Sequence, residues 1–306
     1  MTNERTSLPT SVEVIEALRA AGWLLEQDTA STLERAGFYT VTGKAFPDPD
    51  DPTVSREIDV HAYRQLFRSD ELSLSVGVRV LAECKQSSMP YVVVGGQASA
   101  YELERERQEQ HFRFPRIETG RTAVDGGGQR LHYTPAREYL GLDRLPGNPW
   151  EGGFLGTQLV RLERKAKWLA GNDGIFTSLV YPLAKALTHF RGQFNRSSYA
   201  HHKPGASWAS VDFYYPIVVT SAELFAVDTS VTEIEAVRVP WATVTREIKS
   251  SKIDGRVNID VVTANALEEY IERVNSFGRA VAELVEADPH RFVAHEDHGY
   301  TREGAS

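Results

Sequence analysis

The segment Arg79–Ser87 alternates apolar and charged positions, and this period of two predicts a β-strand. One face of the strand is apolar and carries Val80, Ala82 and Cys84, whereas the other carries Leu81, Glu83 and Lys85. A buried charge needs a charged partner or a metal ion, because burial removes its hydration. Glu83 and Lys85 are therefore candidate functional residues.

The upstream segment Arg56–Ala62 has the same alternation and predicts a second strand. Ile58 and Val60 are expected to face the core, which leaves Asp59 on the other face, beside Glu57 and His61. A polar residue next to an acidic cluster usually contacts the residues of the site and not the ligand itself, and we expect this of His61.

Apolar residues at helical spacing predict two helices before these strands. The first follows a hydroxyl cap, Thr10 or Ser11, and ends near Gly22; the second spans 24–36, with Leu25, Thr29 and Leu33 on one stripe and Glu26 beside it. A strand over 38–46, a solvated acidic turn over 47–52, and a short strand or helix over 63–76 are expected next.

The remaining chain predicts one elaborated domain whose core spans 11–99 and 155–287. An irregular insertion is expected at 102–150, as a substrate-facing lid, and a loose tail at 290–306. Helices are expected at 155–169 and 175–190, strands at 211–219, 224–227, 237–248 and 257–262 that extend the same sheet, and a helix at 264–285. Two domains divided near residue 150 are the alternative.

Composition describes a globular protein of 306 residues with 41% hydrophobic content, one cysteine and a formal charge of −8. A single cysteine excludes an internal disulfide and a cysteine-based zinc site, and it fits a reducing cytoplasm. No apolar run is long enough for a membrane span. The acidic total argues against a protein that coats nucleic acid, although a local basic groove is compatible with it.

A basic stretch with interleaved aromatic residues begins after residue 160. Cationic and planar side chains in proximity are suited to phosphates and unstacked bases. The candidate nucleic-acid-binding residues are Arg161, Arg164, Lys165, Lys167, Arg191, Arg196 and Lys203.

An Asp on one strand followed by Glu-x-Lys on the next resembles the PD-(D/E)xK nucleases, in particular their Mrr-like and archaeal Holliday-junction-resolvase-like members. Ile58 stands where the motif has Pro, and 24 residues separate Asp59 from Glu83, where compact members have a tight hairpin. The resemblance implies an α/β fold of the restriction-endonuclease-like type. This is a mixed central sheet flanked by helices, elaborated here with insertions and extra C-terminal strands.

The resemblance also implies the site. Its catalytic residues are Asp59, Glu83, Lys85, Glu26 and Gln86, and Mg²⁺ or Mn²⁺ is held by Glu26, Asp59, Glu83 and the carbonyl of Cys84. Glu34 is the second choice for the helix carboxylate.

The implied function is metal-dependent hydrolysis of nucleic acid, DNA in preference to RNA, in restriction, phage defence or repair. A partner protein for targeting fits the length of the chain, and the resemblance allows a homodimer. One alternative is a catalytically inactive restriction-like module that binds nucleic acid or acts as an adaptor. Another is an unrelated metal-free α/β protein, which dispersed acids would favour.

Overall fold

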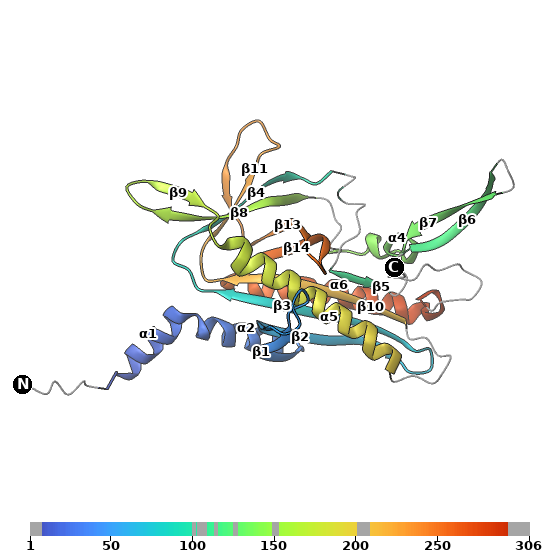
Figure 1. Ribbon diagram of the computed structural model, residues 1–306, viewed down its shortest axis with the longest axis horizontal. Coiled ribbons are helices and arrows are strands. Elements are labelled where there is room, and N and C mark those ends of the chain that lie inside the picture. Colours follow the sequence, from blue (N-terminus) through green and yellow to red (C-terminus); the bar gives the residue numbers. More distant parts are fainter. Residues whose placement is uncertain are drawn as a thin grey trace, which may run out of the picture.

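The computed structural model describes residues 8–99, 102, 109–112, 116–124, 128–148, 153–200 and 209–292. Within these residues a mixed sheet of 12 strands forms the centre, with helices on both faces (Figure 1). The predicted mixed α/β class is therefore confirmed.

The helices are α1 (Ser11–Ala21), α2 (Trp23–Arg35), α4 (Ala136–Leu140), α5 (Tyr181–Ala200) and α6 (Leu267–Ala287). The strands of the first half are β1 (Tyr39–Pro47), β2 (Ser55–Ser69), β3 (Leu74–Lys85), β4 (Tyr91–Gln97), β5 (Gln110–Phe112), β6 (Arg116–Val124) and β7 (Gly128–Pro135). The strands of the second half are β8 (Phe154–Arg164), β9 (Trp168–Gly171), β10 (Ala209–Thr220), β11 (Leu224–Asp228), β12 (Ala236–Arg238), β13 (Trp241–Lys249) and β14 (Asp254–Thr263).

The main sheet has the order β1-β2-β3-β10-β14-β13-β8-β4-β11-β12, with β5 beside β10 and β9 beside β8. The first three strands form an antiparallel meander, and β10 then pairs parallel to β3 along its whole length. The strands of the last third thus extend the sheet of the first third, as the sequence predicted.

Two apolar clusters fill the two sides of the sheet. One packs α2 and α6 on the sheet and includes Leu33, Val80, Ala82 and Ile271. The other packs α5 on the opposite face and includes Leu81, Leu183, Leu187 and Val218. In Figure 1, α5 crosses in front of the sheet and α6 lies behind it. The predicted alternation is confirmed from Val80 to Cys84, because Val80, Ala82 and Cys84 lie in one cluster and Leu81 in the other, and the strand ends at Lys85, before Ser87.

Regular alternation fails in β2 next to Asp59. Ile58 and Val60 are both fully buried, but Ile58 belongs to the α5 cluster and Val60 to the α2–α6 cluster. The expectation that both face one core is wrong. The strand is irregular at this point, because its pairing with β1 skips Asp59 between Val60 and Ile58, and its pairing with β3 begins only at Val60.

The segment 63–76, expected as a separate short element, is the middle of one long hairpin. β2 continues to Ser69 and β3 begins at Leu74, with an irregular register between Gln65 and Phe67. Residues 60–82, which separate Asp59 from Glu83, are therefore the two arms of this hairpin and its turn.

The two N-terminal helices follow the prediction closely. Thr10 caps α1 in a capping box with Glu13, and Gly22, at φ 89°, ends it and begins α2. A positive φ favours glycine at this junction. The buried residues of α2 include Leu25, Thr29 and Leu33, the predicted stripe.

The prediction of a helix at 155–169 is wrong, because this segment forms β8 and β9. Leu155, Leu159 and Leu162 have helical spacing, but β8 pairs with β4 over most of its length and touches β13. Tertiary pairing therefore overrides the local pattern. The helix predicted at 175–190 is present as a π-helical turn, Phe176–Val180, followed by α5.

The segment 102–150 is more regular than predicted where it is described. β5 joins the main sheet, and β6 and β7 form a separate hairpin that projects from the body, with α4 at its base (Figure 1). The predicted tail at 290–306 lies outside the described residues from 293 onward.

The acidic turn at 47–52 is only partly solvated, because Asp48 is buried and Asp50 is half-buried, whereas Asp51 is exposed. Asp48 lies 2.6 Å from the Nζ of Lys185 on α5 and 2.8 Å from the Nε of Arg56. Asp50 accepts hydrogen bonds from the hydroxyls of Tyr181 and Ser250, at 2.7 and 2.8 Å. The turn therefore ties the β1–β2 hairpin to α5 and to the β13–β14 turn.

Candidate active site

Asp59, Glu83 and Lys85 lie together where the beginning of β2 runs beside the end of β3. The Oδ2 of Asp59 accepts a hydrogen bond of 2.7 Å from the backbone N–H of Cys84, which fixes its carboxylate against β3. Glu83 is buried, and its Oε2 is 3.6 Å from the Nζ of Lys85, whose side chain is 35% exposed. The strand pairing thus joins two segments 24 residues apart.

Glu26 reaches the same place from α2. This helix packs on β1, β2 and β3, and the half-buried Glu26 acts electrostatically on Glu83 while Asp59 acts on Glu26. Glu34 is exposed and accepts a hydrogen bond from the Thr40 hydroxyl on β1. Of the two helix carboxylates, Glu26 is therefore the one at the site.

The site carries more negative charge than its single lysine balances. Burial, together with the neighbouring Asp59 carboxylate, raises the pKa of Glu83 to about 8, although Lys85 lowers it. Burial and Asp59 likewise raise the pKa of Glu26. A site of this kind favours binding of a proton or a metal cation.

Gln86 lies against the α1–α2 junction. A Cβ added to Gly22 would be 3.5 Å from the Cβ of Gln86. Gly22 itself lies one helical turn before Glu26. The backbone of β3 is held next to it, since the Lys85 carbonyl accepts hydrogen bonds from Thr220 Oγ1 and Ser221 N at 3.2 and 3.3 Å. The end of β10 therefore helps to position Lys85.

The thiol of Cys84 faces α2, where its Sγ lies 3.5 Å from Thr29 Oγ1. Burial raises the pKa of the thiol to about 12, and the charges of Asp59, Glu26 and Glu83 act in the same direction. The thiol is therefore protonated at physiological pH, and the predicted metal ligand from this residue is its backbone carbonyl.

His61 lies on the α5 side of the sheet and packs on Phe190, with 4.6 Å between the ring centroids. Burial, with Arg79 and Lys44 as positive neighbours, lowers its pKa to about 4. The ring is neutral at physiological pH and serves packing at this position.

Donor chemistry and charge at the site suit a hard divalent cation, because carboxylate oxygens are its preferred ligands. Among the described residues, no three His, Cys, Asp or Glu side chains are grouped closely enough to hold a metal ion. Glu26, Asp59 and Glu83 are thus electrostatic neighbours, and joint coordination would require their side chains to turn toward one ion.

The predicted basic residues divide into two groups. Arg161, Arg164, Lys165 and Lys167 lie on or between β8 and β9, a hairpin that projects at the same end of the molecule as the end of β3 (Figure 1). Arg191 and Arg196 lie further along α5, which runs away from that end, and Lys203 lies outside the described residues.

The hairpin group is exposed and partly engaged locally. Arg161 and Lys165 approach Glu163 at 3.2 and 4.0 Å, and the guanidinium of Arg164 lies 5.1 Å from the ring centroid of Trp168. Trp168 is 49% exposed, so the hairpin presents an aromatic ring together with its cations.

Sequence reasoning missed the residues that hold the site from other elements. Thr220 and Ser221 are about 135 positions after Lys85, and nothing in their own pattern predicts the contact. Gly22 was predicted only to end a helix, although a glycine between two helices also signals a close approach.

No protein-family model, curated protein or solved structure matches the chain. Across the described helices, none has the length and apolar character needed to cross a membrane.

We expect Glu83→Gln to stabilise the protein in EDTA at pH 8.5 and to change it little at pH 5. The folded protein keeps the Glu83 proton up to about pH 8, whereas the unfolded chain loses it near 4.5. The contribution of the protonated Glu83 to the free energy of unfolding is fully present below pH 4.5 and is lost as the pH rises through 8. The Glu83→Gln substitution should therefore raise the free energy of unfolding by about 1–3 kcal/mol at pH 8.5, measured by urea unfolding.

The control for this measurement is Glu247→Gln, at an exposed position of β13. An equal change in stability at both pH values would contradict a buried, protonated Glu83.

Proposed function

We propose that this chain is a metal-dependent phosphodiesterase of the PD-(D/E)xK type that hydrolyses nucleic acid. The proposal is carried by one observation: Glu26, Asp59 and Glu83, from a helix and two adjacent strands, influence one another electrostatically beside Lys85. The restriction-endonuclease-like character of the fold is part of the proposal. It is supported by the helix that precedes the β1–β3 meander and by the strand β10 parallel to β3.

A divalent cation, Mg²⁺ or Mn²⁺, fits the excess of carboxylates, and Glu26, Asp59, Glu83 and the Cys84 carbonyl would hold it. Such an ion neutralises phosphate charge and acidifies a bound water. A bound cation would favour the ionised form of Glu83, and this gives a buried carboxylate at this position a use.

Lys85 is placed to act on the attacking water and on the phosphate. Its ammonium group is partly exposed, while its backbone is fixed by the end of β10, so it can reach substrate from a rigid strand. An ammonium group near the reacting phosphate stabilises developing negative charge. Gln86, beside the α1–α2 junction, would orient the water or a phosphate oxygen.

DNA is the proposed substrate, with the β8–β9 hairpin as the contact to its backbone. The hairpin carries exposed cations and Trp168 at the end of the molecule where β3 ends. Restriction, phage defence or repair in the cytoplasm, with a partner protein for targeting or a second copy of the chain, would suit such an enzyme.

An inactive module that binds nucleic acid or another protein is the second candidate. It is favoured by the absence of a grouped metal-ligand trio in the described part of the chain, and by the contact of 3.6 Å between Glu83 Oε2 and Lys85 Nζ. In that case the pair would have a structural role only.

The test is cleavage of labelled single- and double-stranded DNA and RNA in Mg²⁺, Mn²⁺ or EDTA, beside a thermal-shift titration of each metal. We expect metal-dependent cleavage of DNA, and a metal-induced rise in melting temperature that Asp59→Asn abolishes. Asp254→Asn, at an exposed site, is the control. Tight DNA binding with neither cleavage nor a metal-induced shift would favour the inactive module.

A further inference from the structure

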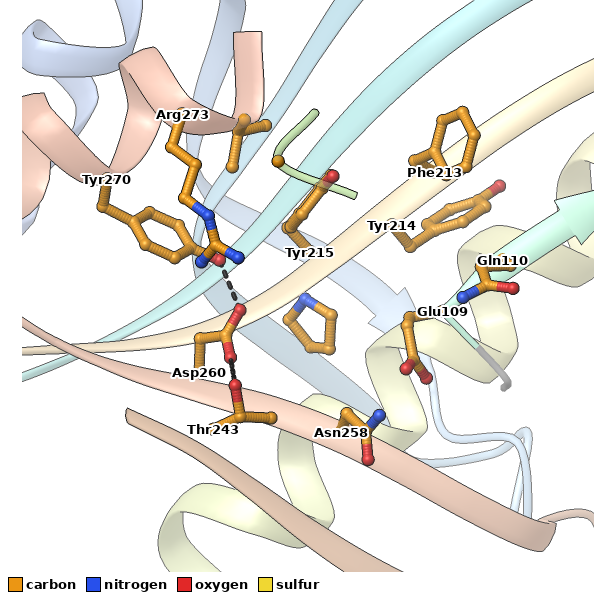
Figure 2. Close-up of a pocket in the computed structure, with 13 residues that line it drawn as sticks. Glu109, Gln110, Phe213, Tyr214, Tyr215, Thr243, Asn258, Asp260, Tyr270 and Arg273 are labelled. Carbon is orange, nitrogen blue, oxygen red and sulfur yellow. Dashed lines mark hydrogen bonds between the residues drawn. The ribbon is translucent and has the colours of Figure 1, made fainter. Parts of the chain in front are cut away.

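A cavity of about 70 Å³ lies beside β10, where this strand leaves β5 and joins β14 (Figure 2). In Figure 2 the hydroxyls of Tyr270 and Thr243 donate to the carboxylate of Asp260, at 2.6 and 2.5 Å. A volume of this size has room for a few water molecules, since one needs roughly 10–15 Å³, whereas a cavity that binds benzene has about 150 Å³. The cavity therefore suits ordered water, and the surface that calls for a partner lies elsewhere, on α1.

The helix α1 presents an apolar face that no described residue covers. None of its residues, Ser11–Ala21, is buried, and the helix projects from the body of the molecule (Figure 1). Its large apolar side chains are Val12, Val14 and Ile15, which are 66%, 41% and 41% exposed, and the half-buried Leu18. At about 3.6 residues per turn these four residues fall on one half of the helix, opposite Glu13, Ala17 and Ala20. We call these four residues the α1 face.

The α1 face gives the helix no stability while it is exposed. A helix of 11 residues is marginal by itself, because isolated helices shorter than about 12–15 residues barely form in water. The capping box of Thr10 and Glu13 secures the first turn only. Most of the stability of a helix in a protein comes from packing of its apolar face. The α1 face therefore calls for burial against another surface.

The undescribed parts of the chain do not offer that surface. Residues 1–7, directly before the helix, are Met-Thr-Asn-Glu-Arg-Thr-Ser, and the longer segments 103–108, 201–208 and 293–306 contain no run of apolar residues that could match the α1 face. The partner of the α1 face is therefore a separate molecule.

The charges at the edge of the α1 face favour a second copy of α1 in antiparallel orientation. Glu16 and Arg19 are exposed and lie on the same edge, next to Val12. When two copies of α1 pack antiparallel, equivalent edges face each other, and Arg19 of each copy comes beside Glu16 of the other. In a parallel pair this edge would face Ala17 and Ala21 instead, and the charges would have no partner across the pair.

We propose that the α1 face is a dimer interface, in which two copies of the chain pack α1 against α1 antiparallel about a two-fold axis. A pair of helices this short buries less than the roughly 1,200 Å² of a stable interface, so the dimer is weak.

The antiparallel pair also fixes where the two carboxylate sites lie. Gly22 ends α1, and Glu26 follows it by one turn. The two sites are therefore at opposite ends of the helix pair, separated by at least the length of α1, about 16 Å. The dimer does not depend on the proposed cleavage activity, because association is measured without a substrate.

The test is sedimentation equilibrium of the whole chain at concentrations from about 1 to about 200 µM, at physiological ionic strength. We expect a monomer–dimer equilibrium with a Kd on the order of 10 µM. A chain that is entirely monomeric at the highest concentration would overturn the proposal.

Ile15→Lys should weaken the dimer by at least about tenfold and leave the melting temperature of the dilute monomer unchanged, because this side chain is exposed. Ala20→Lys places the same charge on the opposite side of α1, is the matched control, and should dimerise like the unaltered chain. Dimerisation unaffected by Ile15→Lys, or weakened equally by Ala20→Lys, would refute the α1 face as the interface.

Charge reversal tests the antiparallel orientation. Glu16→Arg and Arg19→Glu should each weaken the dimer by about fivefold, because each brings like charges together across the pair. The double variant exchanges the two charges and should restore the original Kd. A double variant that dimerises no better than either single variant would contradict the antiparallel pair.

Discussion

Lys85→Ala is expected to reduce metal-dependent cleavage by about 10²–10⁴-fold while the protein stays folded. The side chain is partly exposed and its Nζ lies 3.6 Å from Glu83 Oε2, outside the apolar core, so its loss leaves the core packing of β3 intact. The reduction should fall on the rate of cleavage and not on the melting temperature. Single-turnover cleavage of labelled DNA measures the effect.

Lys249→Ala, in which an 83% exposed lysine side chain is removed from β13, is the matched control and should cleave normally. The metal-induced thermal shift should persist in Lys85→Ala, because the carboxylates remain. Full activity in pure Lys85→Ala protein would refute the assignment of Lys85 and leave the carboxylate cluster without its proposed catalytic partner.

Lys185→Met should lower the free energy of unfolding by about 3–5 kcal/mol, toward the smaller value because Arg56 still pairs with Asp48. Asp48 and Lys185 are almost completely buried, and the bond of 2.6 Å between them joins the acidic turn to α5. Methionine has a similar length but leaves the Asp48 carboxylate with less compensation. Chemical unfolding with linear extrapolation measures the loss.

The dependence on pH gives this prediction a sign. Burial would raise the pKa of Asp48, but hydrogen bonds from Lys185 and Arg56 lower it to about 2, below its ordinary 3.8. Its stabilisation is therefore present above pH 4 and is lost as the pH falls through 2. The deficit of Lys185→Met should be smaller at pH 2.5 than at pH 7. With Lys249→Met as control, a deficit below about 1 kcal/mol would mean that Arg56 alone holds the turn.

The sequence determined most of what is local in this protein. Alternation predicted the strand that carries Glu83 and Lys85, and the stripe of Leu25, Thr29 and Leu33 predicted α2, because burial of one face imposes its period on the chain. The resemblance to the PD-(D/E)xK nucleases, and not the periodicity, named Asp59 and Glu26 as candidates. Neither could decide between Glu26 and Glu34, which depends on the direction in which α2 crosses the sheet.

Only the tertiary structure decided which distant segments meet. β8 became a strand against its helical spacing because β4 lies beside it, and the acidic turn became an anchor because Lys185 is buried against it. The cavity beside β10 likewise has no pattern of its own, since it exists only where β10 leaves β5 for β14. Contacts of this kind are set by packing and strand exchange between segments far apart in the chain, and no periodicity along the chain encodes them.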